Sequence, residues 1–168
     1  ALENSVKAFG EDANETLDVL DKYGEFLNSI DPEMSEPVLK EVLKLTSKED
    51  PNRAPRMLAL GLNLKELGNI PDAESMLLNA VSIYKKHLGE ENVETLSAMV
   101  KLAQLYISQS KSKPAQELLE KSVPLLNNIF DDNHFLILES KENLAEIYRL
   151  QGKYSLSEKL FLESLKGA

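Results

Sequence analysis

The chain has 168 residues, of which 42% are hydrophobic and 28% are charged, and this balance excludes disorder of the whole chain. It contains no cysteine, which excludes disulfides, thiolate catalysis and cysteine-ligated zinc. The net charge is −9, and residues 1–50 alone carry thirteen acidic residues against five lysines, so we expect no nucleic-acid partner and no attraction to anionic membranes.

The first fifty residues predict an acidic helical hairpin. Residues 1–14 are polar, and we expect a frayed start or a short helix there. Apolar residues at helical spacing predict a helix over 15–30, which Asp31-Pro32 ends because a residue before proline leaves the α region. A second helix follows from about 33 or 35 to 45. We expect this hairpin to lack the small residues of later segments. Three roles stay open for it: a cap, an autoinhibitory fold over a groove, or a dimer face.

The polar segment at residues 46–55 predicts a boundary between the hairpin and the rest of the chain, where the helices are expected in pairs. Prolines 71 and 114 fall in first turns, where a missing N–H is tolerated, whereas Pro124 falls inside a helix and should kink it. The predicted helices cover residues 54–67, 71–88, 93–109, 113–130, 135–151 and 155–166.

One unit recurs every forty-two residues along this region. Leu102-Ala103 with Tyr106 returns as Leu144-Ala145 with Tyr148, and it is preceded by Leu60-Gly61 with Leu64 in the tyrosine position. Each copy then breaks at the same offset and continues with a small, a large apolar and a small residue. The breaks are Gly68, Ser110 and Gly152, and the later positions are Ala73, Leu77 and Ala80; Ala115, Leu119 and Ser122; and Ser157, Phe161 and Ser164.

These small residues predict the architecture. Helix backbones approach closely only at Gly, Ala or Ser, and repetition of such crossings at a fixed offset stacks every pair alike. We therefore predict an all-α fold, a right-handed α-solenoid of antiparallel helix pairs. Its concave face would be lined by the first helix of each pair. Residues 1–50 would form the degenerate hairpin, and residues 51–168 three repeats at about 54–92, 93–134 and 135–168.

The pattern resembles the tetratricopeptide repeat, and more narrowly its forty-two-residue form in kinesin light chains. The resemblance rests on Leu102-Ala103 with Tyr106, Leu144-Ala145 with Tyr148, and the turn Gly152-Lys153-Tyr154. It implies a non-catalytic scaffold or adaptor that presents a concave groove to a protein or peptide. Carried over by position, the groove residues would be Leu58, Leu62, Lys65, Ser97, Lys101, Gln104, Ile107, Glu139, Glu142, Asn143, Glu146 and Arg149.

Two known uses of such grooves fit these residues poorly. The positions of a carboxylate clamp for chaperone tails hold Leu58, Leu62, Lys101, Glu139 and Asn143. Of the asparagines with which kinesin light chains bind a peptide backbone, only Asn143 is present, since Lys101 and Ala59 replace the others. We therefore expect a partner with an apolar anchor for the Leu58 end and basic residues for the glutamates. Alternatively, the glutamates only solvate a helix face, with Lys141 and Arg149 as screening partners.

The sequence shows no motif typical of an enzyme active site or a metal site. The histidines, His87 and His134, are forty-seven residues apart near helix-end linkers, and no catalytic or phosphate-binding motif occurs. We expect no catalysis, no metal and no cofactor. An alternative function is a regulatory or self-oligomerising domain of a larger enzyme or assembly factor. The exposed C-terminal end of the array must be covered, either by further repeats in the full protein or by self-association; its apolar residues are Leu160, Phe161, Leu162 and Leu165.

The ends of the sequence bear on its location. It begins at Ala1 without a methionine and stops partway into a repeat, so we expect a fragment or processed form of a larger protein. No apolar run approaches the ~20 residues that span a bilayer, so no direct membrane insertion is expected. A cytoplasmic location, or a soluble compartment of an organelle with the targeting segment missing from this sequence, is the expectation.

Overall fold

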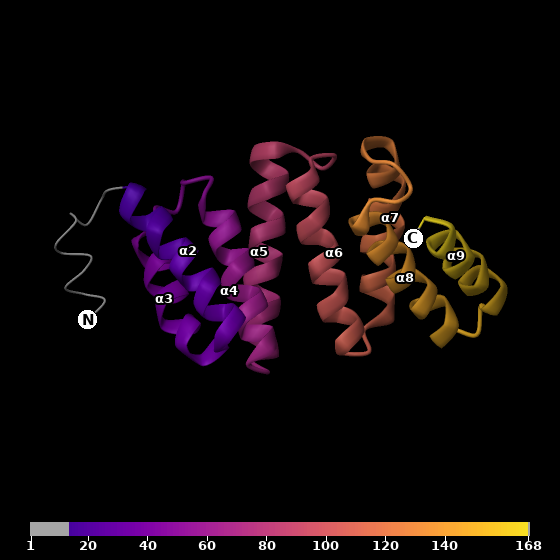
Figure 1. The fold of residues 1–168 in the computed structure, drawn as a ribbon, viewed down its shortest axis with the longest axis horizontal. Coiled ribbons are helices and arrows are strands. Elements are labelled where there is room, and N and C mark those ends of the chain that lie inside the picture. The colour runs from indigo at the N-terminus through magenta and orange to yellow at the C-terminus, as the bar shows by residue number, and fades with distance from the viewer. Residues whose placement is uncertain (1–13, 168) are drawn as a thin grey trace. The chain divides into compact units, whose positions relative to one another are not determined.

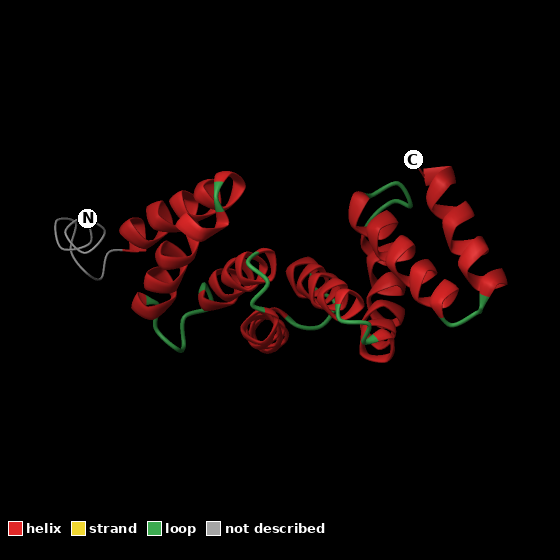
Figure 2. Ribbon diagram, turned by 90° about the horizontal axis from the view of Figure 1, so that it is seen from below, coloured by secondary structure: helices red, strands yellow, loops and turns green. Residues whose placement is uncertain are grey.

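The computed structural model describes residues 14–167, and within them every regular element is an α-helix (Figure 2). The expectation for residues 1–14 therefore lies, apart from Asn14, outside the described residues. Figure 1 labels the helices as α2 (Asn14–Ile30), α3 (Pro32–Leu45), α4 (Arg53–Glu66), α5 (Ile70–Leu88), α6 (Val93–Ser108), α7 (Ser112–Ile129), α8 (Phe135–Leu150) and α9 (Tyr154–Gly167).

The contacts divide the chain into two compact units, of which the first ends at His87 and the second begins at Leu88. In the first unit α2 packs against α3, and α4 packs against both; in the second, α6–α7, α7–α8 and α8–α9 are neighbours. The predicted all-α class and the succession of helix hairpins are confirmed. The separation of residues 1–50 from three repeats, and the capping role of the hairpin, stay predictions.

The breaks between paired helices have the conformation that their residues favour. Gly68 and Gly152 have positive φ angles of 77° and 74°, which a residue without a Cβ adopts at low cost. Ser110 takes the same left-handed conformation, with φ of 59°, at the corresponding turn of the intervening pair. The recurring break therefore imposes one turn geometry on all three pairs, even where the glycine is replaced.

Side-chain caps begin three of the helices. Asp31 accepts a hydrogen bond from the N–H of Glu33 at 3.0 Å, and Asn92 accepts one from Glu94 at 2.9 Å. His134 caps α8 through Nδ1, which accepts from the N–H of Leu136. Helix α7 continues through Pro124, which is exposed, to its end at Ile129; the predicted kink stays a prediction.

The hairpin α2–α3 contains the small residues that we expected it to lack, and that expectation is wrong. A Cβ on Gly24 would lie 2.7 Å from Cδ2 of Leu39, just as one on Gly61 would lie 3.0 Å from Cδ2 of Leu77. Ser35 is buried, and its hydroxyl donates to the carbonyl of Gly24 at 2.8 Å. The hairpin is thus packed through the same close crossing as α4 and α5.

A buried arginine fastens this hairpin to α4. Arg56 donates from Nε to Asp21 at 2.7 Å and from Nη1 to the hydroxyl of Thr46 at 2.9 Å, and its Nη2 lies 3.4 Å from Asp18. Burial raises the pKa of the Asp21 carboxyl, and the hydrogen bond from Arg56 opposes that rise. About two turns further along α4, buried Asn63 donates to Asn28 and to the carbonyl of Pro32, both at 2.8 Å.

The second unit joins its helices mainly through apolar side chains. Ala103 and Ala145 are fully buried at the close crossings, where the first unit has glycine. At the edge of the α7–α8 contact, the hydroxyl of Tyr148 donates to Glu120 at 2.7 Å. Burial and this bond raise the pKa of Tyr148 to about 12.

Candidate binding surfaces

A groove with a volume of about 270 Å³ opens in the first unit, along one face of α4. Two predicted residues, Leu58 and Leu62, lie one helical turn apart and both line it. The wall is completed by a residue of α3, two of α2 and two more of α4, namely Leu39, Glu25, Asn28, Pro55 and Ala59. The groove is thus apolar along its length and carries one carboxylate and one amide.

The polar groups of the groove come from α2. Asn28 is fixed because its Oδ1 accepts a hydrogen bond from Asn63 at 2.8 Å. Its amide nitrogen is therefore the donor that it can offer to a bound chain. Glu25 is exposed and supplies a negative charge beside the apolar floor. The third predicted residue of this unit, Lys65, is outside the lining and lies 3.6 Å from Glu66 instead.

In the second unit the predicted residues lie on α6 and α8. Lys101 of α6 and Glu139 of α8 form an ion pair at 3.1 Å, which brings these two predicted residues together. Ser97, Gln104 and Ile107 are half-buried on α6. The two helices thus share a face on which positive and negative side chains already contact one another.

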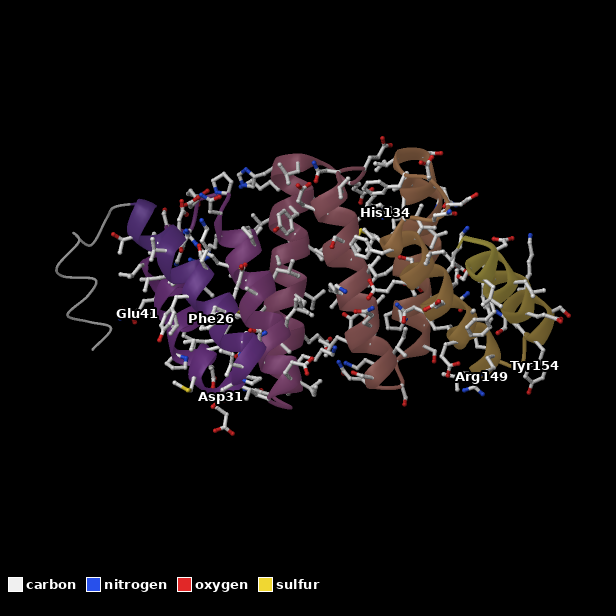
Figure 3. The ribbon with its side chains drawn as sticks, in the orientation of Figure 1. Phe26, Asp31, Glu41, His134, Arg149 and Tyr154 are labelled. Carbon is white, nitrogen blue, oxygen red and sulfur yellow. The ribbon has the colours of Figure 1, made fainter. Side chains whose placement is uncertain are left out.

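Not every glutamate of α8 is free to bind a basic partner, because some already pair with cations of this chain. Glu146 accepts two hydrogen bonds from Arg149, at 2.6 and 2.7 Å, which lower the pKa of Glu146 and raise that of Arg149. Glu142 is exposed. Lys141 is buried and lies 3.4 Å from Asp132 and 3.8 Å from Glu163, away from the glutamates that we expected it to screen. Figure 3 labels Arg149 near the end of α8.

Asn143, at the position that resembles a kinesin-light-chain asparagine, is half-buried on α8. Its Nδ2 is shielded from solvent and has no hydrogen-bond partner among the residues that the structure describes. A buried amide without a partner costs free energy, roughly 1–3 kcal/mol. A bound chain would reach this donor only if neighbouring side chains moved.

Sequence reasoning missed the contribution of α2 and α3 to the groove. The signal was present, because Gly24 and Ser35 are eleven residues apart where Gly61 and Ala73 are twelve apart. Gly24 is, however, 37 residues before Gly61, and Ser35 is 38 residues before Ala73, so neither falls at the forty-two-residue spacing of the later copies. Glu25, Asn28 and Leu39 follow once that shorter spacing is allowed.

Neither histidine is part of a candidate catalytic or metal site among the described residues. His134, which Figure 3 labels, caps α8 and stacks on Phe130 with ring centroids 3.6 Å apart. His87 is exposed near the end of α5. Among the described residues, no three His, Asp or Glu side chains are grouped so that they could bind a metal ion. In the same part of the chain, every helix is too short or too polar to cross a lipid bilayer.

The family follows from two matches. The tetratricopeptide repeat profiles match residues 53–128 and residues 137–168, which together contain most of the helix pairs described above. The chain belongs to the tetratricopeptide repeat family. Tetratricopeptide repeats are in general non-catalytic and serve as scaffolds for protein–protein interaction. No match is found among curated protein sequences.

Solved structures share the fold of this tetratricopeptide repeat chain. BtubC from P. vanneervenii is 17% identical with a TM-score of 0.84, and the match covers 90% of this chain and 63% of BtubC. The nearly identical repeats of a P. anserina protein described as a kinesin light chain are 20% identical, with a TM-score of 0.79 and coverage of 98% and 81%. MamA is also 20% identical, with a TM-score of 0.72 and coverage of 98% and 83%. The chain therefore spans less than two thirds of BtubC.

Proposed function

We propose that this chain binds a protein or peptide segment through the groove of its first unit. The observation that carries the proposal is the apolar floor of Leu58, Leu62 and Leu39 with Glu25 and Asn28 beside it. A concave apolar surface with few polar groups is the usual form of a binding site. The partner would place one apolar side chain on the floor and a lysine or arginine near Glu25.

The energetics favour an extended segment over a single side chain. Burial of one Leu-sized side chain contributes roughly 1.5–3 kcal/mol, which alone gives only millimolar or weaker affinity. Asn28 adds a donor for a backbone carbonyl of the partner. Glu25 adds charge selectivity, which acts more on the association rate and on partner choice than on affinity.

The α6–α8 face of the second unit is a separate candidate contact area, for a segment with basic residues. Basic residues of the partner would approach Glu142 directly, whereas Glu139 and Glu146 already pair with Lys101 and Arg149. A double reversal, Glu142→Lys with Glu146→Lys, tests this area. The expected result is weaker binding of a basic partner, and unchanged affinity would restrict the proposal to the first unit.

The experiment that tests the groove is a selection from a displayed random peptide library, followed by affinity measurement with two matched variants. Leu62→Glu places a charge on the groove floor, whereas Leu78→Glu changes an exposed leucine of α5 that does not line the groove. Loss of about 1.4 kcal/mol corresponds to a tenfold change in affinity, and we expect at least about that loss for Leu62→Glu alone.

The selected sequences give a second readout. They should share an apolar residue with a neighbouring lysine or arginine, and binding should weaken with added salt. Peptides that bind wild type and Leu62→Glu equally, or that carry acidic residues beside the anchor, would overturn the groove as the binding site.

A further inference from the structure

His134 connects the end of α7 to the start of α8 (Figure 3). Its ring stacks on that of Phe130, the residue that follows α7, with centroids 3.6 Å apart and an angle of 9° between the ring planes. The ring of Phe135, the first residue of α8, is tilted by 34° with its centroid 4.8 Å from that of His134. In this arrangement Nδ1 of His134 accepts a hydrogen bond from the N–H of Leu136 at 3.3 Å, and this bond caps α8.

The cap on α8 depends on the protonation state of the imidazole. Nδ1 accepts the bond from Leu136 only while it carries no proton, because an imidazolium has two N–H donors and no acceptor. Histidine is the side chain that ordinarily changes its charge between about pH 5 and pH 8. A positive charge at this place would also lie at a helix N-terminus, where the helix dipole disfavours cations. Protonation therefore removes the hydrogen bond and adds a repulsion.

The equivalent cap forty-two residues earlier is made by a side chain that does not titrate. Asn92 begins α6 in the same way, and its Oδ1 accepts from the N–H of Glu94 at 2.9 Å. An amide oxygen accepts a hydrogen bond at any pH. Histidine at the second of these two positions thus keeps the cap and makes it dependent on protonation.

Phe130 gives the protonated ring of His134 a second set of contacts. A cation is attracted to the face of an aromatic ring, so the stack on Phe130 favours the imidazolium. The charged ring can therefore stay on Phe130 at the end of α7 while it gives up its bond to α8. The side chain has two arrangements, one bonded to α8 and one held by α7 alone.

The imidazole is the group at this joint whose charge changes between about pH 5 and pH 8. Carboxyl groups in general change charge at about pH 4 and lysines at about pH 10. Lys101 pairs with Glu139 at 3.1 Å, and Lys141 lies 3.4 Å from Asp132. The charged residues of the linker and of the first two turns of α8 are Asp131, Asp132, Glu139 and Lys141; the neighbouring helices add Glu94 and Lys101 of α6 and Glu163 of α9, while α7 has none after Lys121.

We propose that His134 is an acid-sensitive cap, and that its protonation releases the first turn of α8. Glu139, which pairs with Lys101, is five residues after His134, so the release also loosens the start of the α6–α8 face. The inference goes beyond the proposed function, because it concerns the conformation of the second unit and requires no partner.

The test follows hydrogen exchange of single amides in the full chain by NMR at about pH 8 and about pH 5. Each rate is compared with that of an unstructured chain at the same pH, which gives a protection factor. The protection factor of Leu136 should fall by roughly 2- to 30-fold at the lower pH, the range that corresponds to the loss of a side-chain cap. The amide of Glu94, which Asn92 caps, is a reference in the same molecule and should keep its protection factor.

Two variants separate the titration of His134 from its structural role. His134→Asn copies the cap of α6 and should protect Leu136 equally at both pH values, whereas His134→Ala should leave this amide poorly protected at both. Unchanged protection of Glu94 shows that each variant is folded. The proposal is overturned if the protection factor of Leu136 in wild type is the same at both pH values. It is also overturned if the factor falls as much in His134→Asn, because another group would then be responsible.

Discussion

The joint between the α2–α3 hairpin and α4 in the first unit and the joint between α7 and α8 in the second have the same place in the repeat but different chemistry. Each joint is compared at the residues five before and two after the small residue of the first helix, which is Gly61 in α4 and Ala145 in α8. At these positions α4 has Arg56 and Asn63, whereas α8 has Ser140 and Ile147. All four are buried. The first joint is therefore fixed by charged and amide hydrogen bonds, and the second by apolar packing with one tyrosine bond at its edge.

The difference shows that the repeat specifies a close crossing without specifying how the next pair is attached. A buried ion pair costs desolvation that its attraction only partly offsets, so it is weak evidence of added stability. It is sensitive to the loss of one partner, because the other charge is then left buried alone. A joint made by apolar packing should lose less stability when one small side chain in it is changed.

The largest effect is expected for Arg56→Met. The change leaves Asp21, which is half-buried, without its 2.7 Å partner, and we expect a loss of roughly 3–5 kcal/mol in the free energy of unfolding. Urea unfolding followed by circular dichroism measures this loss. The matched change at the other joint, Ser140→Ala, should cost less than about 1 kcal/mol because that hydroxyl bonds only within its own helix. Equal losses would remove the distinction between the joints.

Gly61→Ala should follow with a smaller loss. The new Cβ would lie 3.0 Å from both Cγ and Cδ2 of Leu77 and 3.2 Å from Cβ of Met76, so buried neighbours must shift. Overpacking costs roughly 1–3 kcal/mol, and helix propensity returns up to about 1 kcal/mol, which leaves net destabilisation. The reverse change at the equivalent site, Ala145→Gly, should also destabilise. A more stable Gly61→Ala would show that the two crossings are equally wide.

Tyr148 gives the α7–α8 joint a dependence on alkaline pH. Its pKa is raised from 10.0 to about 12, so the folded chain retains a proton that the unfolded chain releases. The stabilisation is complete below pH 10 and is lost as the pH rises from 10 to about 12. Phenolate absorbance should show one tyrosine that titrates late, and Tyr148→Phe should remove it. We expect a cost of about 0.5–1.5 kcal/mol at neutral pH for that variant. An unchanged titration curve would contradict the bond to Glu120.

The smallest effect is expected for Arg149→Ala. Its pair with Glu146 is on the surface of α8, where water and salt screen the attraction of an ion pair, so the pair adds little to stability. Unfolding in low and high salt should differ little between this variant and wild type. A loss comparable with that of Arg56→Met would mean that surface pairs, and not the buried joint, stabilise the fold.

The sequence was sufficient to predict the helices and their close crossings, because Gly68, Leu77 and their equivalents recur at one spacing. It was insufficient for the hairpin, because Gly24 and Ser35 are 37 and 38 residues before their equivalents Gly61 and Ala73, and not forty-two. The repeat pattern predicted that Leu58 and Leu62 lie on an accessible face of their helix. It could not predict which residues form the opposite wall of the groove, because that wall depends on how α2 packs against α4. Pairing of Lys101 with Glu139 was also hidden, since it joins helices thirty-eight residues apart.

The most direct test of the account is an NMR titration of the chain with a library-selected peptide, in which amide shifts report where the peptide binds. We predict that the shifts concentrate at the groove residues of α2, α3 and α4, around Asn28, Leu39 and Leu62, and that Leu62→Glu abolishes them. Shifts confined to α6 and α8, with the groove residues unchanged, would contradict the assignment of the binding site to the first unit.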